Sequence, residues 1–110
     1  MQEPVLISPY TYTPDYVYKI WYDGEPHMIY IGSTNTPIMT RLSQHARDTG
    51  NSKKAKWIQA NKGKRLRIQR IANAKSPKDA RIAEYIAILA YEHAGYTLMN
   101  QRMPIAIQTK

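Results

Sequence analysis

Two β-strand patterns separated by a turn constrain the fold of this chain more than any other feature. The segment 16–22 reads Tyr-Val-Tyr-Lys-Ile-Trp-Tyr and is dense in β-branched and aromatic residues, which favour strands. The turn-forming sequence Asp-Gly-Glu-Pro follows at 23–26, and a second strand pattern covers 28–32. Because so few residues join the two patterns, they predict an antiparallel hairpin.

The first predicted helix follows this hairpin. Thr36 is expected to be its N-cap, with Pro37 at the first helical position, and the helix should end near Gly50. The apolar residues of its buried side are expected to be Ile38, Leu42 and Ala46.

A second, short and strongly basic helix is predicted next. Ser52 is expected to cap it, and it should run to about Asn61. Its apolar anchors are Trp57 and Ile58, and Gly63 should prevent its continuation.

A third strand and a long helix complete the predicted fold. Apolar and polar residues alternate over 65–69, as in a half-buried strand. The sequence Ser-Pro-Lys-Asp at 76–79 is a helix start, and the helix should reach about Ala94, with Gly95 as its left-handed terminator. Residues 96–100 should extend or loop back. The predicted class is therefore α+β, with a small, mainly antiparallel sheet of three strands flanked by helices.

The composition bounds the domain organisation. With 110 residues, the chain has room for one small domain, which we expect at 16–100, after an extended proline-containing arm at 1–15 and before a tail at 101–110. The absence of Cys excludes a disulfide scaffold, a thiolate zinc site and cysteine catalysis, and it suits a cytoplasmic protein. No signal peptide or membrane-spanning segment is apparent, so we expect no membrane association.

Positive charge is concentrated in one part of the sequence. Between Arg41 and Lys78 there are 12 Lys and Arg residues and one acidic residue, whereas the rest of the chain has four basic and seven acidic residues. This distribution favours a polyanionic partner, above all nucleic acid, although solvated helix faces are the ordinary alternative. The residues predicted to bind DNA are Lys53, Lys54, Lys56, Lys62, Lys64, Arg65 and Arg67.

Tyrosines crowd the predicted hairpin. Alternation places Tyr16, Tyr18 and Tyr22 on one face of the first strand, and Tyr30 lies on the second strand. In a chain without Phe, Tyr can serve simply as the core aromatic residue. A phenol acts as a base only where nearby cations favour the phenolate, and this chain is rich in cations.

Arg41 and His45 are spaced i, i+4 on the first predicted helix, so both side chains leave the same face. Arg suits a bidentate grip on phosphate, and His exchanges a proton near neutral pH. An exposed pair without function is the alternative interpretation.

Glu84 interrupts an apolar row of the last predicted helix. It must pair or bind something, either Arg81 one turn earlier or a divalent cation that accompanies a phosphate. The acidic residues show no close cluster of the kind that holds two metal ions, and the three histidines lack zinc-site spacing. Phosphodiester chemistry with one divalent ion is therefore the chemistry that these residues favour.

Taken together, these residues resemble the GIY-YIG nuclease family. The segment 16–18 stands where the family has Gly-Ile-Tyr, and 30–34, Tyr-Ile-Gly-Ser-Thr, resembles its second motif. The pair of Arg41 and His45 matches the family's Arg-x-x-x-His helix. The segment 76–88 resembles the family's Glu-bearing helix, and Glu84 stands at the position of that Glu. Asn100 stands at the place of a late Asn. The five elements together span nearly the whole chain.

The resemblance implies a DNA endonuclease that uses one Mg²⁺ or Mn²⁺ ion held by Glu84. It further implies that Tyr18 and Tyr30 flank the attacking water, one of them as general base, and that Arg41 stabilises charge on the phosphate. His45 would assist the nucleophile or the leaving oxygen. Gly32 would allow close approach of the backbone, and Asn100 would support the site by hydrogen bonding.

One residue departs from the family pattern, because Tyr16 replaces its first Gly. The chain also has no room for a separate DNA-binding domain, so specificity should come from the basic segment 51–70, DNA structure, self-association or a protein partner. Two alternatives remain at this point: a non-catalytic DNA-binding or accessory module, and a metal-free ribonuclease that would need His27 or His93 beside His45. A bacterial or phage-infected cell is the expected setting.

Overall fold

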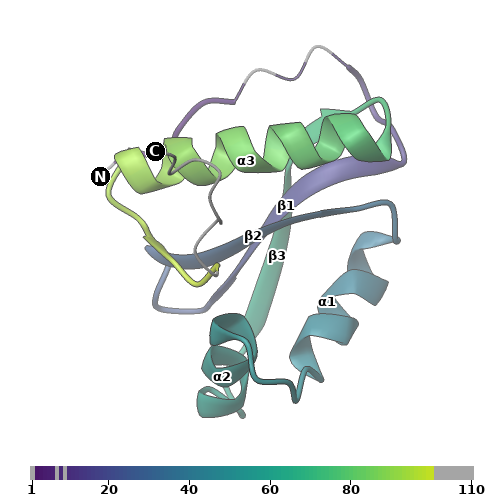
Figure 1. Cartoon of the computed structure of the whole chain (residues 1–110). Helices are drawn as coiled ribbons and strands as arrows, with labels where there is room; N and C mark the ends of the chain where they lie inside the picture. Colours follow the sequence, from purple (N-terminus) through teal and green to yellow (C-terminus); the bar gives the residue numbers. More distant parts are fainter. Residues whose placement is uncertain (1, 7, 9, 101–110) are drawn as a thin grey trace.

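Helices cover both faces of a mixed sheet (Figure 1). The computed structural model describes residues 2–6, 8 and 10–100. Within that part of the chain, the strands lie in the order β3-β1-β2-β4. They are β1 (Asp15–Tyr22), β2 (Met28–Thr34), β3 (Leu66–Ala74) and β4 (Thr97–Leu98). The predicted hairpin is present, since β1 pairs antiparallel with β2, and β3 pairs antiparallel with the other side of β1.

The α+β class is confirmed, but the expectation of three strands needs correction. The short strand β4 adds a parallel pairing to β2, with the amide of Thr97 donating to the carbonyl of His27 at 2.8 Å and that of Met99 to Ile29 at 2.7 Å. Gly95, with φ of 101°, turns the chain back from the last helix so that this pairing can form. A strand of two residues is too short to leave a periodic signal in the sequence.

Three helices are found in the described residues: α1 (Ile38–Ala46), α2 (Lys53–Ala60) and α3 (Pro77–His93). The predicted caps of the last two are confirmed, because Ser52 accepts a hydrogen bond from the amide of Ala55 and Ser76 accepts one from Asp79. Figure 1 shows α3 on one face of the sheet and α1 and α2 on the other.

The prediction for α1 was wrong at both ends. Pro37 is the N-cap residue and no side chain caps the helix, whereas the carbonyl of Thr36 accepts the Tyr16 hydroxyl at 2.6 Å. The helix ends at Ala46, before Gly50. Ala46 is exposed and His45 is buried, so α1 is rotated toward its histidine from the orientation that an apolar stripe alone predicted.

The two faces of the sheet support separate apolar clusters. Under α3 the buried residues are Val17, Ile29, Ile31, Ala72, Ala87, Ile88, Tyr91 and Leu98. Against α1 and α2 they are Tyr16, Tyr18, Ile20, Tyr22, Trp57, Ile58 and Met99, which confirms the predicted tyrosine face of β1. Lys19 points to the α3 face and is nevertheless only 6% exposed.

The described residues of the N-terminal arm are tied to the domain. Glu3 forms an ion pair with Lys19 at 2.8 Å and accepts the Tyr91 hydroxyl at 2.6 Å, so the buried lysine is compensated. Ser8 donates to, and accepts from, the backbone of Asn73 on β3. The arm therefore packs along the sheet, while the predicted tail at 101–110 lies outside the described residues. No helix among the described residues is long and apolar enough to cross a membrane.

Candidate active site

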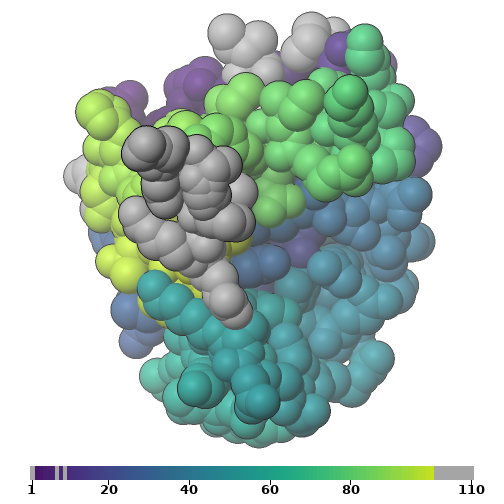
Figure 2. Space-filling model, in the orientation of Figure 1, coloured from purple at the N-terminus to yellow at the C-terminus, as the bar shows by residue number. Residues whose placement is uncertain are grey.

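The predicted catalytic side chains converge near the outer edge of β2. Because β4 pairs only with Met28 and Ile29, the rest of β2 has no neighbouring strand on the side opposite to β1 among the described residues. In the space-filling view, the blue surface of β2 lies between α3 above and α1 and α2 below (Figure 2). This edge can thus receive side chains from both helical layers.

Tyr18 occupies the centre of the site, and Gly32 explains its position. The two residues are partners across the β1–β2 ladder. A Cβ atom added to Gly32 would overlap the Tyr18 hydroxyl and would lie 2.7 Å from its Cζ atom. Any side chain at position 32 would therefore displace the phenol, which is a requirement of space and not of backbone conformation.

Arg41 and His45 both contact the Tyr18 hydroxyl. The Nε atom of Arg41 donates to it at 3.1 Å, and the Nε2 atom of His45 lies 2.6 Å from it. The i, i+4 spacing thus brings both side chains to one oxygen, as expected from a shared helix face. The alternative of an exposed pair does not occur, since His45 is 2% exposed and Arg41 is half-buried.

Lys54 and Asp48 extend this network on the far side of the imidazole. The Nζ atom of Lys54 lies 2.8 Å from Nδ1 of His45 and 2.5 Å from the carboxylate of Asp48. The α2 helix, capped by Ser52, presents Lys54 inward in this way. Lys54, one of the residues predicted to bind DNA, thus directs its ammonium group to Asp48 and His45.

Tyr30 lies beside the same imidazole. Its ring centroid is 5.4 Å from that of His45, and Nζ of Lys54 lies 5.5 Å from the Tyr30 ring. Tyr18 lies beside His45 as well, with ring centroids 5.5 Å apart. Both tyrosines named from the sequence thus adjoin one histidine.

Glu84 reaches the site from α3. Its Oε1 atom accepts a hydrogen bond from the hydroxyl of Ser33 on β2 at 2.6 Å. The alternative pairing with Arg81 is wrong, because no ion pair joins these two residues in the described part of the chain and Arg81 points to solvent. A half-buried carboxylate is therefore directed toward the β2 edge without an ion-pair partner.

The electrostatics couple Glu84 with the other site residues. Burial raises the pKa of Glu84, against the lowering effects of the Ser33 hydrogen bond and of Arg41. Burial, followed by the Glu84 charge, raises the pKa of Tyr30. Burial, followed by the neighbouring Tyr30, also raises the pKa of Tyr18, in opposition to Arg41. The protonation states of these groups therefore depend on one another.

The side chain of Asn100 forms hydrogen bonds to the edge of β2, where a neighbouring strand would otherwise pair. Its Oδ1 atom accepts the amide of Ile31 at 3.0 Å, and its Nδ2 atom donates to the carbonyl of the same residue at 2.7 Å. These two bonds continue the pairing beyond β4 and satisfy the backbone next to Gly32. The side chain acts on the strand and does not point to the tyrosines.

The site residues can be compared with the ligands that a divalent cation requires. Among the described residues, no group of three or more His, Cys, Asp and Glu side chains lies close enough to hold a metal ion. Glu84 is a single hard oxygen donor whose charge is destabilised by burial, and an added cation would relieve that cost. The residues fit an ion held by one carboxylate, with water and substrate oxygens as its other ligands.

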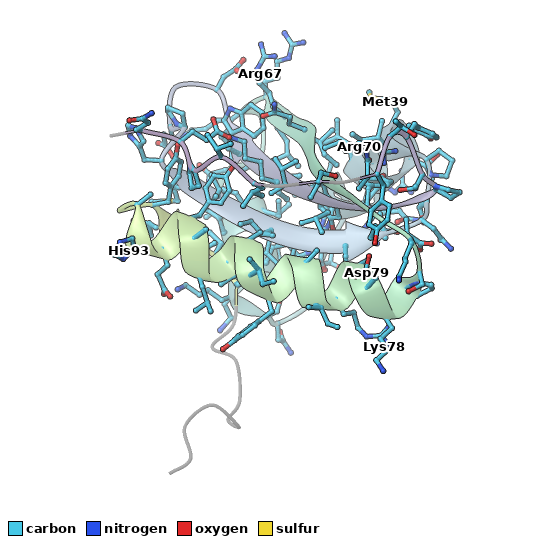
Figure 3. The ribbon with its side chains drawn as sticks, turned by 90° about the horizontal axis from the view of Figure 1, so that it is seen from above. Met39, Arg67, Arg70, Lys78, Asp79 and His93 are labelled. Atoms are coloured by element: carbon cyan, nitrogen blue, oxygen red, sulfur yellow. The ribbon has the colours of Figure 1, made fainter. Side chains whose placement is uncertain are left out.

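The remaining basic residues of the predicted DNA-binding set differ in availability. Lys53 donates to the carbonyl of Leu98 at 3.1 Å, Lys64 lies 3.9 Å from Glu25, and Arg67 pairs with Asp23. Figure 3 shows Arg67 projecting from the edge of the sheet. The predicted cations whose side chains make no hydrogen bond or ion pair to the described residues are Lys56, Lys62 and Arg65, all of them exposed.

Three contributors to the site were not identified from the sequence: Ser33, Asp48 and the inward role of Lys54. Ser33 adjoins the Tyr-Ile-Gly segment, and its position on an edge strand was the available signal. Asp48 was visible as the one acidic residue in the basic stretch, which indicates a local partner. The other histidines do not join the site, because His27 packs against Tyr96 and His93 lies at the end of α3 (Figure 3).

Comparison of the chain with protein-family models, with curated proteins and with solved structures gave no significant match. Function must therefore be inferred from the geometry of the chain's own residues.

Proposed function

We propose that this protein is a metal-dependent DNA endonuclease of the GIY-YIG type, acting through the site at the β2 edge. The observation that carries the proposal is the convergence of Tyr18, Arg41 and His45 on one hydrogen-bonded centre. Glu84, the carboxylate that the resemblance names as metal ligand, influences the same two tyrosines electrostatically. Core packing alone gives no reason to gather a guanidinium, an imidazole and a half-buried carboxylate at one strand edge.

Arg41 suits the role of phosphate ligand. Its Nε atom is held by Tyr18 and its Nη1 atom by Gln44, which fixes the plane of the guanidinium. Its Nη2 atom makes no hydrogen bond to the described residues. A preorganised guanidinium of this kind stabilises negative charge on the scissile phosphate in the transition state.

Of the two tyrosines, Tyr18 is our candidate for the general base. Its oxygen contacts both the Nε–H of Arg41 and the His45 ring, and N–H donors stabilise a phenolate. The Tyr30 hydroxyl makes no hydrogen bond to the described residues, whereas Glu84 opposes the ionisation of both tyrosines. In this assignment Tyr18 acts as the phenolate and becomes the phenol when it takes a proton from the attacking water, while Tyr30 and His45 shape the space around it.

Glu84 would hold the single Mg²⁺ or Mn²⁺ ion, with Ser33 orienting the carboxylate by its hydrogen bond. When bound, the ion supplies positive charge that stabilises the phosphate in the transition state. The hydrogen bond to Oε1 leaves Oε2 as the oxygen with no partner among the described residues.

Two competing functions predict different results. A non-catalytic DNA-binding or accessory module would bind DNA in a salt-sensitive manner without turnover. A metal-free ribonuclease would need a second histidine near His45, and neither His27 nor His93 lies there. A nuclease is favoured over both because the Glu84 carboxylate would only hinder binding to a polyanion unless a cation accompanied it.

The test is conversion of supercoiled plasmid to open-circular or linear DNA by purified protein, in Mg²⁺ and in EDTA. We expect cutting only in Mg²⁺, and a loss of at least about 100-fold in rate for Glu84→Ala, because transition-state charge is no longer stabilised. DNA binding should persist in the variant, since the phosphate contacts lie elsewhere.

Glu92→Ala is the matched control, because it removes an exposed carboxylate from the same helix. It should cut at the wild-type rate. Cutting by the wild type in EDTA would exclude the single-metal mechanism. Binding of plasmid and of branched DNA without cutting of either would favour the accessory module.

A further inference from the structure

We propose that Lys54, held by Asp48, is a positioning residue that fixes His45 as its Nε2–H tautomer and thereby directs the Tyr18 hydroxyl. Neither Lys54 nor Asp48 belongs to the motifs discussed above.

The first step concerns the hydrogens on Lys54. A lysine ammonium has three N–H donors and no acceptor. Its Nζ atom lies 2.5 Å from the Asp48 carboxylate, and one of its remaining hydrogens faces Nδ1 of His45 at 2.8 Å. Nδ1 must therefore accept, and it carries no proton of its own.

The second step places the imidazole proton. Burial, followed by the charges of Lys54 and Arg41, lowers the pKa of His45 to about 3, so the ring is neutral at neutral pH. A neutral imidazole has one N–H and one acceptor nitrogen. Since Nδ1 is the acceptor, Nε2 carries the hydrogen and donates it to the Tyr18 hydroxyl oxygen at 2.6 Å.

The third step concerns Tyr18 itself. Its oxygen accepts from Nε2–H of His45 and also from Nε–H of Arg41, which is a donor only. Both acceptor positions of the phenol oxygen are then occupied, and its own hydrogen points away from both α1 side chains. With the opposite tautomer, Tyr18 would instead donate to His45, and its hydrogen would be turned toward α1.

This inference deepens the proposed function and rests on it only for the effect on turnover. His45 becomes a donor that stabilises a Tyr18 phenolate, and it cannot be the acceptor of the Tyr18 proton. The positive charge of Lys54 acts within the protein, which separates it from the exposed lysines of the same helix.

The tautomer is measured directly by long-range ¹H–¹⁵N NMR correlation on ¹⁵N-labelled wild-type protein at pH 7. A His45→Gln variant identifies the His45 signals among those of the three histidines. We expect a protonated-type ¹⁵N shift at Nε2 and an unprotonated-type shift at Nδ1. A proton found on Nδ1 would overturn the proposal, whether or not the protein cuts DNA.

The variant Lys54→Met tests whether Lys54 causes this state. The His45 proton should move toward Nδ1, and kcat for DNA cutting should fall by about 10- to 100-fold with KM changed less, as for groups that orient a functional histidine. Retention of the Nε2–H form in Lys54→Met would also overturn the proposal. If the variant does not fold, the wild-type spectrum still decides the tautomer.

Lys78→Met is the charge-matched control, because Lys78 is exposed at the start of α3 (Figure 3). It removes one positive charge and should preserve both the His45 spectrum and kcat. If the wild type shows no nuclease activity, the proposed function fails while the tautomer result stands. If the wild type cuts but carries the proton on Nδ1, the reverse holds.

Discussion

Among single residues, His45 is buried in the folded protein, whereas its imidazole titrates near neutral pH in the unfolded chain. It is 2% exposed and lies beside two tyrosine rings and the cations of Lys54 and Arg41. The pKa of its ring falls from 6.5 to about 3, mainly because burial removes solvent from the charged form. The folded protein therefore holds a neutral imidazole over a range in which the unfolded chain holds an imidazolium.

This difference predicts that stability decreases as the pH falls below about 6.5. Between pH 6.5 and about 3, the unfolded state binds a proton at His45 that the folded state does not bind. The free energy of unfolding should then fall by up to about 1.4 kcal/mol per pH unit. Urea unfolding at several pH values between 7 and 5 measures this slope.

The variant His45→Gln should show a shallower slope than the wild type, whatever its absolute stability. Glu84 works in the opposite direction, since its raised pKa means that the folded state gains protons there first as the pH falls. The difference between wild type and variant isolates the histidine. His27→Gln, which removes an exposed ring, should keep the wild-type slope, and an equal slope in His45→Gln would contradict the assignment.

At the scale of secondary structure elements, the open edge of β2 depends on one side chain. Asn100 offers its amide to both backbone groups of Ile31, immediately before Gly32. The variant Asn100→Ala should reduce the free energy of unfolding by about 1–3 kcal/mol, because a donor and an acceptor lose their partners. Chemical denaturation of wild type and variant measures the difference.

Asn51→Ala provides the comparison, because Asn51 is exposed in the loop between α1 and α2. It should change stability by no more than about 0.5 kcal/mol. Equal effects of the two substitutions would show that the pairing with Ile31 contributes little. Amide hydrogen exchange at Ile31 should also accelerate in Asn100→Ala.

Those elements that carry local signals could be predicted from the sequence. The hairpin, the Ser52 and Ser76 caps and the left-handed Gly95 each follow from the chemistry of a few adjacent residues. The start of α1 could not be predicted from local sequence. Thr36 is a residue type that caps helices, but its carbonyl accepts a hydrogen bond from the hydroxyl of Tyr16, which lies 20 positions earlier in the chain. The strand β4 is fixed by long-range pairing alone.

The site was predictable in its residue types and not in its connections. The i, i+4 spacing predicted that Arg41 and His45 share one helix face, and in the structure both side chains contact the Tyr18 hydroxyl. No sequence pattern says that Lys54, one of three lysines within four positions, turns inward to His45. That direction depends on how α2 packs against the sheet through Trp57 and Ile58.

At the scale of the whole molecule, some basic side chains form ion pairs within the protein and others are exposed to solvent. Lys19 and Lys54 are compensated by Glu3 and Asp48, so they contribute little to an outer field. The exposed cations on α2 and in the connection between α2 and β3 remain as the candidate contacts for the DNA backbone. They are Lys56, Lys62 and Arg65.

We therefore predict that the triple variant Lys56→Ala, Lys62→Ala and Arg65→Ala binds DNA more weakly and with less dependence on salt. Each phosphate contact contributes about 0.9 to the slope of log K against log salt concentration, so the slope should decrease in magnitude by about 2 to 3. Fluorescence anisotropy with a labelled duplex at several salt concentrations gives both slopes. Because these residues lie outside the hydrogen-bonded network of the site, kcat at saturating DNA should change far less than affinity.

A double variant, Lys78→Ala and Arg81→Ala, controls for the loss of charge. Both residues are exposed on α3, which covers the face of the sheet opposite to α1 and α2 (Figure 1). If DNA contacts α2 and β3, this variant should retain the wild-type slope. Equal decreases in the two variants would mean that DNA responds to total charge, and the binding surface would then have to be sought without reference to α2.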